Sequence, residues 1–182
     1  NKIFKFIILT PSNEYMIYMA AAFSYPINIL LNYPLPKHFY LSSKINKKNT
    51  KKIILFSPTH RWDGLISPIE NLLCDDNFIN ALEEKNYEIK YTLHPFEKKK
   101  VDFCKNVRLF NSNWHDVFSL VTDYSSIGYD YLYSGGNNLI YFTPDLKSFE
   151  AYEGAGPIYK SHIDQNYKAD TKKQLFEILS SL

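Results

Sequence analysis

Short apolar runs rich in β-branched residues alternate along this sequence with segments whose apolar residues have helical spacing, and this alternation most constrains the fold. We expect strands at 3–9, 27–31, 53–57, 87–93, 107–110, 120–122 and 139–142. We expect helices at 13–23, 78–85, 114–118, 126–134 and 171–182. Strands that alternate with helices are typical of α/β proteins. We therefore predict a doubly wound parallel sheet of the Rossmann type.

A polar and basic segment divides the chain. Residues 42–52 (SSKINKKNTKK) follow the helix-breaking sequence YPLP at 33–36, which predicts a linker. On this basis, residues 1–41 are expected to end one Rossmann-like domain, and residues 53–182 to form a second one. The chain has 182 residues but does not begin with methionine, so we expect it to be part of a longer protein.

Composition excludes several classes of protein. No stretch approaches the roughly 20 consecutive apolar residues of a membrane-spanning helix. The net charge of +2 gives no general attraction to nucleic acid. Cys74 and Cys104 lie far apart and outside any CxxC spacing, as is usual in a reducing compartment. The sequence has neither a GxGxxG motif nor a metal-binding motif such as HExxH, so no cofactor and no metal are expected.

Polar residues gather where the predicted strands end. In open α/β sheets, ligands bind beyond the carboxyl ends of the strands. The loops to consider are therefore 58–61 (PTHR), 94–96 (HPF), 122–126 (TDYSS) and 143–145 (TPD). This coincidence predicts a ligand site formed by several loops.

The TDYSS sequence leads directly into a predicted helix. The amino end of a helix presents unpaired N–H groups and the positive end of the helix dipole, which together favour an anion. Ser125 and Ser126 would add hydroxyl donors, and their small side chains let a phosphate approach the backbone. Alternatively, Asp123 or Ser125 simply caps the helix.

One histidine and one arginine in these loops are suited to phosphate chemistry. His94 precedes a proline, which restricts its backbone, and an imidazole can donate a proton to a leaving group near neutral pH. Arg61 offers the planar guanidinium that binds phosphate through two hydrogen bonds. As alternatives, His94 could bond a neighbouring loop at the end of its strand, and Arg61 could be a surface residue.

Taken together, these segments resemble the CDP-glycerol glycerophosphotransferase family, whose members build teichoic acids and related capsules. The resemblance covers residues 50–160 and follows the order of the family's carboxyl-terminal half. The matching segments are ILFSPTHR (54–61), YTLHPF (91–96), VTDYSSIGYDYLYSG (121–135), LIYFTPDL (139–146) and GAGPIY (154–159).

The resemblance implies a GT-B arrangement of two facing Rossmann domains, in which the carboxyl-terminal domain binds a CDP-activated polyol. Carried over to this sequence, Ser125 and Ser126 would hold the pyrophosphate, and His94 would be catalytic by stabilising the departing CMP. Thr122 and Asp123 would shape the turn, and Arg61 would add positive charge. Thr59 and Asp130 complete the expected substrate-binding residues.

The implied partners are the CDP-polyol donor and a polymer or lipid-linked acceptor, with no nucleic acid. Such an acceptor would bring a cytoplasmic enzyme to the inner face of the cell membrane, where it could bind the membrane surface. Two other functions remain open from the sequence. One is a GT-B glycosyltransferase that uses a nucleotide sugar, and the other is a nucleotide-binding fragment without activity.

Overall fold

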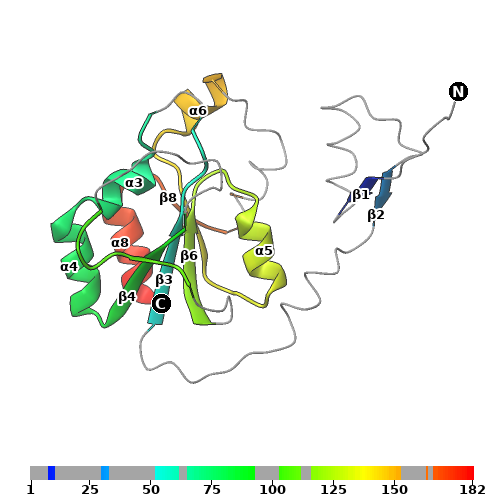
Figure 1. Ribbon diagram of the computed structural model, residues 1–182. Coiled ribbons are helices and arrows are strands. Elements are labelled where there is room, and N and C mark those ends of the chain that lie inside the picture. The colour runs from blue at the N-terminus through cyan, green and yellow to red at the C-terminus, as the bar shows by residue number, and fades with distance from the viewer. Residues whose placement is uncertain are drawn as a thin grey trace, which may run out of the picture.

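A parallel sheet of six strands forms the main body of the protein (Figure 1). The computed structural model describes residues 8–10, 30–32, 52–61, 65–92, 103–111, 116–152, 163 and 166–182. In sequence order the strands are β3 (Lys52–Ser57), β4 (Tyr87–Tyr91), β5 (Arg108–Leu109), β6 (Val117–Thr122), β7 (Leu139–Phe142) and β8 (Tyr167–Ala169).

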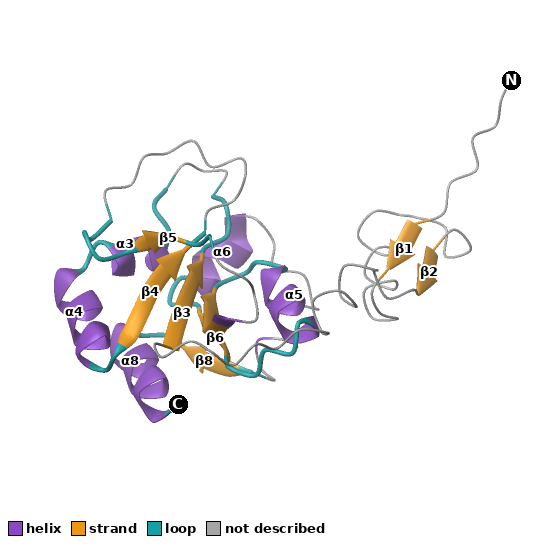
Figure 2. Cartoon of the chain, turned by 60° about the horizontal axis from the view of Figure 1, so that its bottom comes forward, coloured by secondary structure: helices purple, strands orange, loops and turns teal. Residues whose placement is uncertain are grey.

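The spatial order of these strands is β5-β4-β3-β6-β7-β8, and every neighbouring pair is parallel. Numbered within the sheet, this order is 3-2-1-4-5-6, which is the order of dinucleotide-binding Rossmann folds. Figure 2 shows β4, β3 and β6 side by side at the centre. The predicted doubly wound parallel sheet is therefore confirmed.

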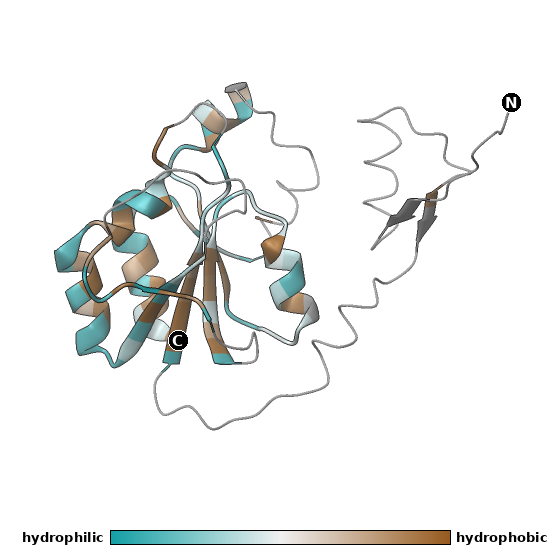
Figure 3. Cartoon of the chain, viewed as in Figure 1, coloured by the Kyte–Doolittle hydropathy of each residue, from teal (hydrophilic) through white to brown (hydrophobic). Residues whose placement is uncertain are grey.

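Helices cover both faces of the sheet. In Figure 1, α3 (Pro68–Leu73), α4 (Asp76–Glu84) and α8 (Lys172–Ser181) lie on one face, and α5 (Ile127–Tyr133) lies on the other. The short helix α6 (Leu146–Tyr152) lies beyond one end of the sheet. This layering explains why β3 and β6 carry buried apolar residues on both of their faces. Figure 3 shows much of these two strands in brown.

Alternate residues of β3 pack into two separate hydrophobic clusters. Ile54 and Phe56 join the cluster under α3, α4 and α8, whereas Leu55 packs on the face that α5 covers. Both clusters contain residues with no exposed surface, among them Ile79 of α4 and Tyr141 of β7. The period of two along β3 thus places one core on each side of the sheet.

Two further strands form a separate two-stranded parallel sheet. They are β1 (Ile8–Thr10) and β2 (Leu30–Asn32). Each overlaps the end of a predicted strand, at 3–9 and 27–31 respectively, and extends one residue beyond it. The helix predicted at 13–23 lies outside the described residues, as does all of the linker predicted at 42–52 except Lys52. The division into two domains therefore stays a prediction.

One predicted helix is wrong where the structure describes it, and three elements were not predicted. The short helix expected at 114–118 overlaps β6, which begins at Val117, because Val117, Ser119 and Leu120 are buried in the sheet. Helices α3 and α6 and the edge strand β8 were not predicted. For α3 a signal existed, since Ser67 and Glu70 form a capping box in which each side chain accepts a hydrogen bond from the other's backbone N–H.

Asp75 connects α4 to α8 and gives stability that depends on pH. Its carboxylate accepts a hydrogen bond from the Phe78 N–H and lies 2.6 Å from the Lys172 ammonium, and these contacts lower the pKa of Asp75 below its usual 3.8. Because the pKa of Asp75 is lower in the folded protein, its charged carboxylate stabilises the fold at pH values above the usual pKa of 3.8. That contribution disappears as the pH falls through the lowered pKa.

We expect Asp75→Asn to cost about 0.5–1 kcal/mol near neutral pH, because asparagine keeps the cap but loses the ion pair. The difference from wild type should shrink as the pH falls below 3.8. Urea unfolding across that range checks this, with Glu177→Gln as the control because Glu177 is an exposed partner of Lys173. A difference that stays constant with pH would contradict the assignment.

Candidate functional site

The carboxyl ends of β3 and β6 meet at the point where the strand order reverses. Ser57 and Thr122 are register partners there, and the Thr122 hydroxyl donates a hydrogen bond of 2.6 Å to the Ser57 carbonyl oxygen. In doubly wound sheets this switch point is where ligands bind, because the loops that leave the two strands diverge to opposite faces. The two loops concerned, 58–61 and 122–126, are two of those that the sequence predicted.

Asp123 joins these two loops. Its Oδ1 atom accepts hydrogen bonds from the Thr59 N–H (2.8 Å), the Thr59 hydroxyl (2.6 Å) and the Tyr124 N–H (2.8 Å). Its Oδ2 atom lies 3.2 Å from Nη2 of Arg61. Asp123 has no exposed surface, so it acts by holding the loops together. Burial raises the pKa of Asp123, and the donors on Thr59 and Arg61 oppose that shift.

Arg61 is buried between two carboxylates and two aromatic rings. Its Nη2 atom also lies 3.0 Å from Oδ2 of Asp145, in the loop that follows β7. Its guanidinium carbon is 4.6 Å from the centre of the Phe149 ring and 5.2 Å from that of Tyr124. Two carboxylates therefore surround one guanidinium and balance its positive charge. The role of Arg61 toward a ligand stays a prediction.

Tyr124 and Phe149 form a stacked pair that brings α6 into the site. The ring centres are 3.7 Å apart and the planes are 11° from parallel. The Tyr124 hydroxyl donates a 2.8 Å hydrogen bond to Oδ1 of Asp145, and burial is the main reason that the pKa of Tyr124 is raised. The sequence predicted loop 143–145 as a ligand loop. It did not predict that Tyr124 and Phe149 stack on each other. Tyr124 falls within the TDYSS motif, whereas Phe149 carried no signal.

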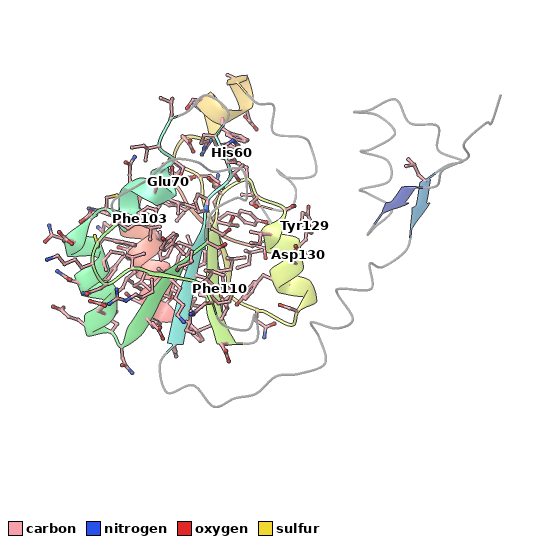
Figure 4. The ribbon with its side chains drawn as sticks, in the orientation of Figure 1. His60, Glu70, Phe103, Phe110, Tyr129 and Asp130 are labelled. Atoms are coloured by element: carbon pink, nitrogen blue, oxygen red, sulfur yellow. The ribbon has the colours of Figure 1, made fainter. Side chains whose placement is uncertain are left out.

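Ser125 and Ser126 lie at the start of α5, beside this buried cluster. Ser125 is half-buried, and its hydroxyl oxygen accepts a hydrogen bond from the Ile127 N–H at 3.3 Å. Ser126 is exposed at the N-cap position and makes no side-chain capping bond. Asp130 follows in the first turn of α5, and Figure 4 shows it near Tyr129.

A family model describes residues 30–180 and carries the description CDP-Glycerol:Poly(glycerophosphate) glycerophosphotransferase. The chain belongs to this glycerophosphotransferase family. The match includes both loops at the switch point and all of the six-stranded sheet. No curated protein matches the chain.

Solved structures of the wall teichoic acid polymerase TagF share the fold. One of them, a variant soaked with CDPG, has a TM-score of 0.71 and 20% sequence identity, and another has a TM-score of 0.68 at the same identity. Each alignment covers 95% of this chain and 48% of the solved chain. This chain therefore spans about half the length of the structures that it matches, and at this identity the likeness establishes the fold.

Most of the glycerophosphotransferase residues expected from the sequence gather at one place. Thr59 and Arg61 both bond to Asp123, and the preceding residue Thr122 bonds to the Ser57 carbonyl oxygen. Ser125 and Ser126 follow in the same loop, and Asp130 lies in the first turn of the next helix. His94 lies outside the described residues, so its catalytic role stays a prediction. His60 is at the same end of the sheet as α6 (Figure 4).

Among the residues that the structure describes, no group of three or more histidine, cysteine or acidic side chains could hold a metal ion. No helix among the same residues combines the length and apolarity needed to cross a membrane. Both cysteines are described, and they form no disulfide. Burial raises the pKa of Cys104 to about 12, which keeps its thiol protonated.

Proposed function

We propose that this chain is the donor-binding half of an enzyme that transfers a polyol phosphate, first of all glycerol phosphate, from a CDP-activated donor. The acceptor would be a teichoic-acid-like or capsular polymer, or a lipid-linked chain at the inner face of the cell membrane. The observation that carries this proposal is the family match over residues 30–180. The TagF structure soaked with CDPG, which shares the fold, is consistent with a CDP-linked donor.

Helix capping favours α5 as the place where the donor's pyrophosphate binds. In dinucleotide-binding folds the pyrophosphate lies at the helix after the first strand, which corresponds here to α3. That position already holds the buried Glu70 carboxylate of the capping box, whose negative charge opposes an anion. Ser126 at the start of α5 makes no side-chain cap, and its neighbour Ser125 is only half-buried. Both can therefore face a phosphate.

The chemistry follows from this placement. An acceptor hydroxyl would attack the phosphorus that carries the polyol, the bond from that phosphorus to the CMP oxygen would break, and CMP would leave. Such a transfer needs donors fixed around developing negative charge more than it needs a covalent nucleophile. Ser125, Ser126 and their N–H groups would supply such donors, and Asp123 with Thr122 would hold them in place. His94 would stabilise the oxygen of the departing CMP.

Arg61 and Asp130 would complete the donor site in different ways. Arg61 would offer N–H groups from a fixed position, because Asp123 and Asp145 already balance its charge. Asp130 is a carboxylate in the first turn of α5, so it suits polyol hydroxyl groups better than phosphate oxygens. Thr59 would act through Asp123, to which both its N–H and its hydroxyl donate.

Calorimetric titration with CDP-glycerol tests this proposal, with CDP-ribitol, UDP-glucose and CMP-sialic acid as comparators. We expect binding of the CDP-polyols, and a loss of affinity of about tenfold or more in Ser125→Ala/Ser126→Ala, because hydrogen bonds to charged groups are each worth about 1.5–3 kcal/mol. The pair Ser180→Ala/Ser181→Ala is a matched control, since these exposed serines end α8.

Two results would contradict the proposal. A preference for UDP-glucose or CMP-sialic acid would favour a glycosyltransferase of the same fold. Equal affinity in the two serine pairs would remove the start of α5 from the donor site. Folding of each variant is checked by urea unfolding, so that a lost site is distinguished from a lost fold.

A further inference from the structure

Asp145 is bound to both Arg61 and Tyr124, although it comes from a different loop. One of its oxygen atoms lies 3.0 Å from Nη2 of Arg61, and the other accepts the Tyr124 hydroxyl at 2.8 Å. Asp145 directly precedes α6, which carries the Phe149 ring that stacks on Tyr124. One carboxylate thus joins the loops after β3, β6 and β7.

These contacts hold the Arg61 guanidinium through its Nη2 atom and leave its Nε–H donor without a partner among the described residues. Asp123 and Asp145 both contact the same Nη2 atom, and the Phe149 ring lies within 4.6 Å of the guanidinium carbon. Among the described residues, Nε of Arg61 is buried and has no hydrogen-bond partner. A buried donor without a partner costs free energy unless a ligand or another group satisfies it.

Asp145 differs from Asp123 in its exposure. The Asp123 side chain is inaccessible, whereas about a quarter of the Asp145 side chain (28%) is exposed beside Arg61. Asp145 therefore lies at the rim of the cluster, whereas Asp123 lies inside it. Replacing Asp145 should disturb the orientation of Arg61 more than it disturbs the core.

We infer that Asp145 is a positioning residue of the donor site, which orients Arg61 so that the remaining guanidinium N–H groups meet an oxygen of the donor's pyrophosphate. This inference rests on the proposed function. Asp145 itself does not contact the reacting atoms, and a carboxylate would repel the donor if it did. It acts through the ion pair with Arg61 and the hydrogen bond from Tyr124.

The chain has only two arginines, which makes a direct test feasible. The Nε–H groups of Arg61 and Arg108 give two signals in a proton–nitrogen NMR spectrum, and Arg108 is exposed. We expect the buried Arg61 signal to exchange slowly with solvent, and Asp145→Asn to accelerate this exchange about tenfold. Asp145→Glu keeps the charge and should bring the exchange back toward the wild-type rate. Glu177→Gln, on α8, is the matched control for loss of a carboxylate.

Calorimetry with CDP-glycerol on the same samples connects this orientation to the donor. Asp145→Asn should weaken the affinity about fivefold or more, and Asp145→Glu less, because an oriented charged donor binds better than a mobile one. Unchanged exchange of the Arg61 signal in Asp145→Asn would overturn the inference, as would faster exchange with unchanged donor affinity. A wild-type chain that binds no CDP-glycerol would overturn the proposed function, and the Arg61 signal would still show whether Asp145 orients the guanidinium.

Discussion

Asp123→Ala is expected to lower the free energy of unfolding by about 3–5 kcal/mol, a large part of the 5–15 kcal/mol that stabilises a typical domain. The alanine would leave the buried Arg61 with Asp145 as its remaining carboxylate partner. It would also remove the acceptor of three donors, namely the N–H and hydroxyl of Thr59 and the N–H of Tyr124. Each donor left without an acceptor costs about 1–3 kcal/mol, and these costs are already part of the expected loss.

Urea unfolding monitored by circular dichroism measures this effect. Asp123→Asn is the informative second variant, because its amide oxygen can still accept from Thr59 while the charge opposite Arg61 is lost. Glu177→Gln removes an exposed carboxylate of α8 and should change the stability by less than about 0.5 kcal/mol. A loss below about 1 kcal/mol in Asp123→Ala would mean that the loops are held by other contacts.

His94→Ala is expected to lower kcat about 10²–10⁴-fold and to change donor affinity much less, because general acid catalysis acts on the transition state. His94 follows β4, whose neighbour β3 is parallel to it, so the chain leaves both strands at the same edge of the sheet. Imidazole can provide a proton or a hydrogen bond to the oxygen of the departing CMP near neutral pH.

The measurement is steady-state transfer from CDP-glycerol by the active protein that contains this chain, together with calorimetry of the donor. His115→Ala is the control, since in the sequence His115 comes two positions before the first residue of β6, whereas His94 comes three positions after the last residue of β4. A kcat within about threefold of wild type in His94→Ala would remove His94 from the catalytic step.

The sequence predicts the sheet well where burial on both faces makes a strand apolar. The predicted strand 53–57 and β3 differ by one residue, and β7 agrees fully with 139–142. The missed strand β8 is a three-residue edge strand in which Tyr167 and Lys168 are exposed, so no apolar pattern marks it. The helix expected at 114–118 is wrong at 117 and 118, which belong to β6. Over so short a run, the apolar residues fit the 3.6-residue period of a helix and the two-residue period of a strand equally well.

The site was predictable as a group of loops but not as a network of contacts. Strand ends alone place the loops 58–61, 122–126 and 143–145 at one edge, because all of the strands run in parallel. The sequence cannot show that Arg61 is buried between Asp123 and Asp145, since these residues are separated by 62 and 84 positions. A buried arginine with two carboxylates and an exposed arginine in a loop look the same in a sequence.

The pairing of β3 with β6 also determines when this site can exist during synthesis. Strands β3, β4 and β5 form one half of the sheet, and β6, β7 and β8 form the other half. Strand β3 pairs with β4 in its own half and gains its second neighbour, β6, only after β6 is synthesised. Helix α8 then returns to the first half, where the Tyr87 hydroxyl donates to the Leu179 carbonyl oxygen. Because contacts so distant in sequence form late, the ribosome must release nearly the whole domain before the edge loops take their final positions. In a nascent chain stalled before β6, α3 and α4 can cover one face of β3, but the face that carries Leu55 is expected to stay exposed until the later residues of its cluster are made.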